Sequence, residues 1–201
     1  MVEQPSISAI EALQRLCVGN ARFTSNSRSE AKPTADRRPF AIVITCSDSP
    51  VPAEKIFDRS SDDLLVLSVA GNVVGPPLIE RVELATSTFG TPLVVVMGHS
   101  DCGAVKATLD LVRAKLDDPT NRIRPAVVSL VELDAQADDA ALLDAAIRAN
   151  VRCSADHLRH GSRQLEALTQ QGKLAVVGAQ HNRLTGRVEF FDVPTELPGG
   201  C

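Results

Sequence analysis

Four short runs of almost wholly apolar, largely β-branched residues recur along this chain of 201 residues. The runs are Phe40–Thr45 (FAIVIT), Leu64–Ser68 (LLVLS), Leu93–Met97 (LVVVM) and Leu174–Val177 (LAVV). Continuous apolar runs of this length are typical of strands in a parallel sheet that is covered on both faces, because a strand with one solvated face alternates apolar and polar residues. The runs therefore predict a central sheet of buried, mainly parallel strands.

Apolar residues at helical spacing lie between these runs. We expect helices at residues 6–24, 82–88, 105–114, 125–133 and 142–167, the last of them interrupted near Arg159–Ser162. Arg187–Phe191 (RVEFF) follows a turn and predicts a final strand, whereas His181 is predicted to lie in a loop after the fourth run. This alternation predicts an α/β fold whose mainly parallel central sheet is flanked by helices.

The composition argues against two classes of partner. A net charge of −4 gives no attraction toward nucleic acid or an anionic membrane. No stretch approaches the roughly 20 apolar residues that span a bilayer, and no uninterrupted apolar segment marks a signal peptide. Five cysteines at irregular spacing do not match the disulfide framework of a small secreted domain. We therefore expect a cytoplasmic protein that binds neither nucleic acid nor membrane.

Residues with metal-binding chemistry follow the first and third apolar runs. The first run leads into Cys46 and Asp48, and the third leads into His99 and Cys102. Ligands of α/β sheets bind at the carboxyl ends of the strands, so both loops are expected at one edge. Thiolate and imidazole are preferred zinc ligands, and three protein ligands with an exchangeable fourth position are typical of a catalytic site. The pattern predicts zinc bound by Cys46, His99 and Cys102, with Asp48 close enough to become a fourth ligand.

Several blocks of the chain resemble the signature sequences of β-class carbonic anhydrases. They are CSDSPVPAEKIFD (Cys46–Asp58), VAGNVV (Val69–Val74), GHSDCGAVKA (Gly98–Ala107) and VVGAQHNRLTGRVEFF (Val176–Phe191). The resemblance covers roughly residues 35–192 and implies a parallel-sheet homodimer that can assemble further, with its active site at the dimer interface. It also implies that Gly71 and Gly103 line the substrate pocket.

The same resemblance suggests how the chain is divided. Residues 1–34 resemble the family's N-terminal helical arm, which packs on the partner subunit. Residues 35–193 are expected to form the zinc-binding α/β domain, and residues 194–201 a loose C-terminal tail.

Three positions depart from the family's pattern. Pro50 stands where the family has an arginine that holds the carboxylate matching Asp48 away from the metal. Arg37 replaces a glutamine that helps to position the substrate, and Ser68 replaces an arginine before the V-A-G-N block. Proline has no hydrogen-bond donor, so it cannot hold Asp48. We expect Arg37 either to reach Asp48 and act with it in catalysis or to remain a solvated surface residue.

The leading interpretation is zinc-dependent hydration of carbon dioxide to bicarbonate and a proton. Zinc lowers the pKa of water in its open position toward ~7, and Asp48 would accept a hydrogen bond from that water. Two alternatives remain. The altered pocket could hydrolyse a related molecule such as carbonyl sulfide or carbon disulfide. Alternatively, Asp48 could close the metal site and leave a catalytically weak or silent zinc-binding scaffold.

Overall fold

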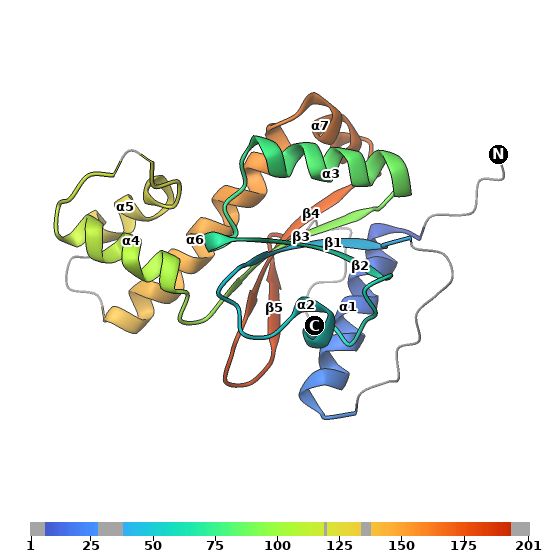
Figure 1. The fold of residues 1–201 in the computed structure, drawn as a ribbon, viewed down its shortest axis with the longest axis horizontal. Coiled ribbons are helices and arrows are strands. Elements are labelled where there is room, and N and C mark those ends of the chain that lie inside the picture. The colour runs from blue at the N-terminus through green and yellow to red at the C-terminus, as the bar shows by residue number, and fades with distance from the viewer. Residues whose placement is uncertain (1–6, 28–37, 119, 134–137, 194–201) are drawn as a thin grey trace.

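A five-stranded sheet forms the centre of the computed structural model, which describes residues 7–27, 38–118, 120–133 and 138–193 (Figure 1). Its strands are β1 (Ala41–Cys46), β2 (Leu64–Val69), β3 (Leu93–His99), β4 (Ala175–His181) and β5 (Val188–Phe191). They lie in the order β2-β1-β3-β4-β5. The first four are parallel, and β5 pairs antiparallel with β4. The predicted mainly parallel α/β sheet with an added edge strand is therefore confirmed.

The three inner strands are buried along their whole length, as their continuous apolar sequences predict. The main difference from the predicted strands is at the end of β4, which continues four residues beyond Val177. His181 is consequently a buried strand residue paired in register with His99, and its prediction as a loop residue is wrong.

The helices form two layers on the sheet and a third group beyond one of its ends (Figure 1). The layers contain α1 (Ala9–Thr24) and α2 (Ala53–Ile56) on one face, and α3 (Pro76–Phe89), α6 (Asp139–His160) and α7 (Arg163–Gln170) on the other. The third group comprises α4 (Gly103–Arg113), α5 (Arg124–Leu133) and the first part of α6, packed around Cys46 and Cys102. The predicted break near residues 159–162 separates α6 from α7. Within the described ranges, no helix is long and apolar enough to cross a membrane.

Helix α1 packs against the sheet of its own chain. Leu13 and Leu16 are almost fully buried among the side chains of β1, β3 and α2. The buried side chain of Asn20 donates to the Ile56 and Gly186 carbonyls and accepts from the Val188 N–H, at 2.9–3.1 Å. This docking leaves the apolar side chains of Ile10 and Val18 on α1 exposed. The packing of this helix on a partner subunit, which the resemblance implies, remains a prediction.

Gly19 gives a test of this docking. A Cβ atom added at Gly19 would lie 1.7 Å from the backbone oxygen of Phe57, and a backbone atom cannot swing aside. We expect Gly19→Ala to destabilise the protein by at least the ~1–3 kcal/mol typical of overpacking, despite the better helix propensity of alanine. Chemical denaturation measures this, with Val18→Ala at the neighbouring exposed position as the control. Equal stability of the two variants would show that α1 does not dock as described.

Candidate metal centre

Two loops bring the predicted metal-binding residues together. Strands β1 and β3 are parallel neighbours, so their carboxyl ends open at the same edge of the sheet. Cys46 is the last residue of β1 and Asp48 follows it, while His99 ends β3 and Cys102 immediately precedes α4. The ligand atoms of these four side chains all lie within 4.8 Å of one another. The loops therefore converge as their sequence positions predict.

The sulfur atoms of Cys46 and Cys102 have the spacing that a tetrahedral zinc ion requires. They lie 3.8 Å apart, and both side chains are at least 98% buried. Two Zn–S bonds of about 2.3 Å at a tetrahedral angle place their sulfur atoms about 3.8 Å apart. The thiol pair therefore fits the metal without rearrangement of β1 or α4.

His99 presents the nitrogen that would face the ion. Its Nδ1 lies 2.9 Å from the carbonyl oxygen of Ser100, an arrangement that leaves Nε2 directed toward the cluster. Nε2 is 2.6 Å from Oδ1 of Asp48. Two atoms that bind the same zinc ion at about 2.0–2.1 Å lie about 3.3 Å apart, so the shorter contact is a hydrogen bond. A metal ion would have to displace the shared proton.

The charges at this cluster suit a cation. A hydrogen bond from Cys102 lowers the pKa of the Cys46 thiol to about 5, and the same bond together with burial raises the pKa of Cys102. Burial lowers the pKa of His99, but hydrogen bonds to Cys46, the Ser100 carbonyl and Asp48 outweigh it and raise that pKa to about 8. One thiolate and one carboxylate thus share the site with a proton that a metal ion can replace.

Asp48 is held by groups other than an arginine. Its Oδ1 contacts His99 Nε2, and its Oδ2 accepts a hydrogen bond of 3.0 Å from the backbone N–H of Gly103. Burial raises the pKa of Asp48, but its hydrogen-bonding interactions with Cys46, His99 and the backbone N–H of Gly103 lower it overall, so the side chain is an anion. Among the described residues, no arginine forms an ion pair with this carboxylate. Nothing in that part of the chain pulls Asp48 away from the metal-binding atoms.

The positions that depart from the family's pattern do not fill this role. Pro50 and Ser68 are exposed. Arg37 lies outside the described residues, so its predicted contact with Asp48 remains a prediction.

The two glycines predicted to line the substrate pocket both touch the cluster. Gly103 donates to Asp48, and a Cβ added to it would lie 3.2 Å from Oδ2 of that residue. Gly71, in the 3-10 turn η1 (Ala70–Asn72), donates its N–H to the sulfur of Cys46 at 3.0 Å. Their contacts with ligand side chains are structural observations, whereas their contact with a substrate remains a prediction.

Comparisons with known proteins agree with this arrangement. The family model described as carbonic anhydrase matches residues 41–188, which include both loops and the four parallel strands β1 to β4. The carbonic anhydrase of Mycolicibacterium smegmatis is 31% identical over 92% of this chain and 95% of its own length. Crystal structures of two tetrameric β-carbonic anhydrases from Sordaria macrospora include a chain that matches with a TM-score of 0.61 and 21% identity, over 90% of this chain and 89% of that chain.

The chain belongs to the β-carbonic anhydrase family. The family also has relatives that act on another small molecule. A carbon disulfide hydrolase of Saccharolobus solfataricus is 34% identical over 77 residues, which are 38% of this chain and 37% of that protein.

His181 lies beside the candidate metal centre, because it pairs in register with His99. It is 1% exposed, and neither ring nitrogen has a hydrogen-bond partner among the described residues. Burial, followed by the charges of His99 and Arg183, lowers its pKa to about 4, so the ring is neutral. The small residues Gly178 and Ala179 before it gave no strand signal, because they lack the β-branched side chains that mark β1 and β3.

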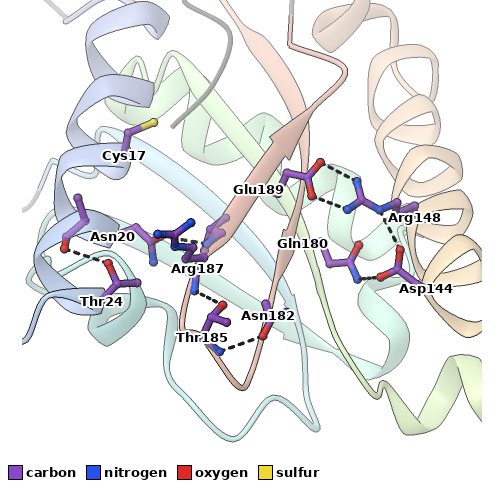
Figure 2. A pocket seen from close by; sticks show the side chains of 12 residues that line it. Cys17, Asn20, Thr24, Asp144, Arg148, Gln180, Asn182, Thr185, Arg187 and Glu189 are labelled. Atoms are coloured by element: carbon purple, nitrogen blue, oxygen red, sulfur yellow. Dashed lines mark hydrogen bonds and ion pairs between the residues drawn. The ribbon is translucent and has the colours of Figure 1, made fainter. Parts of the chain in front are cut away.

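A separate cavity of about 660 Å³ lies where α1, α6, β4 and β5 meet (Figure 2). None of the four metal-binding residues lines it. Arg148, one of the two arginines that line it, is paired with Asp144 and Glu189, and the buried amide of Gln180 donates to Asp144 at 2.6 Å. These contacts fasten α6 to the last two strands.

Proposed function

We propose that the protein hydrates carbon dioxide reversibly, with zinc held by Cys46, His99 and Cys102. The observation that carries this proposal is the convergence of those three side chains with Asp48 at the carboxyl ends of β1 and β3, in a chain of the carbonic anhydrase family. The spacing of the two sulfur atoms and the thiolate-imidazole donor set suit zinc.

When bound, zinc supplies a Lewis acid that makes a water molecule acidic near neutral pH. The protein's own groups orient that water and the proton it loses. Asp48 is the acceptor: it is anionic, its side chain is 45% exposed, and the Gly103 N–H fixes its Oδ2. Its Oδ1 can then accept the hydrogen bond from the water and pass the proton to solvent.

Two further functions have specific support. The carbon disulfide hydrolase relative favours a related linear substrate, and the altered pocket positions Pro50 and Ser68 are consistent with such a change. The contact of Asp48 with His99, with no arginine pairing among the described residues, favours closure of the metal site by the carboxylate. In that case the protein is a weak enzyme or a zinc-binding scaffold.

Rate measurements on the zinc-loaded protein separate the three functions. We expect carbon dioxide hydration, followed by stopped-flow with a pH indicator, to exceed the rate of buffer and to stop when a chelator removes the metal. Faster hydrolysis of carbon disulfide or carbonyl sulfide than hydration of carbon dioxide would favour the related substrate. Full zinc occupancy without any of these activities would favour the scaffold.

We also predict a homodimer as the minimum assembly, which can associate further. The structurally similar proteins of Sordaria macrospora are tetrameric, and apolar side chains such as Val18 and Leu84 remain 53% and 67% exposed in the isolated chain. Light scattering at micromolar concentration should give at least twice the mass of one chain. A monomeric mass would contradict this prediction.

A further inference from the structure

We propose that Asn150 of α6 is a positioning residue for the metal centre, acting on Cys46 through the backbone of Gly71. This inference rests on the proposed role of Cys46 as a metal ligand. Asn150 is far from the metal loops in the sequence. Its side chain donates to the carbonyl oxygen of Gly71 and not to a metal-binding side chain.

Gly71 is the link between Asn150 and Cys46. Its N–H donates to Cys46 Sγ at 3.0 Å, and its carbonyl oxygen accepts from Asn150 Nδ2 at 2.7 Å. The two bonds hold the residue from both sides. They also keep it in the left-handed region, at φ +62° and ψ 20°, where the N–H points at the sulfur.

Glycine is the residue type best suited to this link at position 71. A side chain is strained at this φ, and a Cβ would lie 2.6 Å from Cδ1 of Ile123. The conformation therefore favours glycine, and its buried carbonyl needs a hydrogen-bond partner. Asn150, which is 2% exposed, is the partner present.

Asn150 can position Gly71 only if α6 itself is fixed. Three side chains of α6 bond to the last part of the chain. Asp144 accepts a hydrogen bond from Gln180, and Arg148 donates two hydrogen bonds to Glu189 (Figure 2). Arg152 forms an ion pair with Asp192. The same helix supports the second metal loop. Cγ2 atoms of Ile147 and Val151 lie 2.9 Å from where a Cβ of Gly98 would be, directly before His99. One helix thus sets the position of both metal loops.

The chemical consequence concerns the charge on sulfur. A thiolate that receives an N–H hydrogen bond is held in one orientation, and part of its charge is stabilised before a metal arrives. Groups that orient metal ligands in this way typically change metal affinity about 10–100-fold when they are removed. Asn150 should therefore affect metal binding without contacting the ion.

The test compares Asn150→Ala and Asn150→Asp with Asn20→Ala. The matched control is Asn20, because it is also a buried helical amide that bonds to backbone groups, and it lies on α1 away from the metal loops. Zinc affinity is measured by competition with a chelator. The sulfur-to-cobalt absorption band of the cobalt-loaded protein reports directly on the thiolate ligands.

We expect both Asn150 variants to bind zinc about 10–100-fold more weakly than the native chain and to show an altered sulfur-to-cobalt band. Asn20→Ala should lower the melting temperature and leave affinity and band unchanged. Native affinity and band in either folded Asn150 variant would overturn the inference, as would an equal loss of affinity in Asn20→Ala. Failure of the native chain to bind zinc would instead refute the proposed function.

Discussion

Replacing Cys102 by serine should remove zinc from the protein and abolish carbon dioxide hydration. Serine is nearly the same size and is a favoured residue immediately before a helix, so the start of α4 is preserved. Its hydroxyl is not one of the side-chain groups that bind zinc at neutral pH. The loss should therefore come from the metal, and the domain should also become less stable, because metal binding contributes to the free energy of folding.

Cys153→Ser is the control for this change. Cys153 is also a free cysteine, but it lies on α6 and is not one of the four metal-binding residues. Burial raises the pKa of its thiol. Elemental analysis of protein purified without added metal should give about one zinc per chain for the native protein and Cys153→Ser, and below about 0.1 for Cys102→Ser. Full occupancy in Cys102→Ser would contradict the ligand assignment.

Replacing Pro50 by arginine should raise carbon dioxide hydration from a low native rate. An arginine at this position could pair with Asp48, which now contacts His99 and the Gly103 N–H. Hydrogen bonds to a charged group contribute about 1.5–3 kcal/mol, so a pair that keeps Asp48 off the metal should increase the rate about 10–100-fold. Stopped-flow rates measured at equal zinc occupancy test this effect.

Two further variants show whether the added guanidinium is the cause. Pro50→Ala removes the ring without adding a donor and should leave the rate low. Arg37→Gln should lower the rate only if Arg37 already controls Asp48. A fast native enzyme that is unaffected by Arg37→Gln would mean that another group governs the carboxylate, and the closed-site account would then be wrong.

The sheet could be predicted because its inner strands are buried on both faces. Burial of that kind requires continuous apolar residues, and β1 and β3 have them along their length. The end of β4 could not be predicted in the same way. Its burial depends on neighbours distant in sequence: Gly178 lies under the ring of Phe191, and His181 is enclosed between β3 and β5. The packing of α1 on its own chain also depends on tertiary contacts, made by Asn20 with the β4–β5 hairpin.

The metal-binding cluster could be predicted because Cys46 and Asp48 lie in one loop, His99 and Cys102 lie in another, and both loops follow parallel strands. Asn150 was missed because an asparagine within a helix usually faces solvent. A signal was present, since Ile147, Asn150, Val151 and Ser154 recur at the spacing of one buried helical face. The contact of Asp48 with Gly103 was missed for another reason: backbone donors have no signature in the sequence.

X-ray absorption at the zinc edge of the metal-loaded protein tests whether Cys46, His99 and Cys102 bind the ion, because it counts the atoms around the ion by type and distance. We predict two sulfur atoms at about 2.3 Å and two nitrogen or oxygen atoms at about 2.0–2.2 Å, which are His99 with either Asp48 or water. A shell with no sulfur, or with a single sulfur atom, would contradict a site built from Cys46, His99 and Cys102.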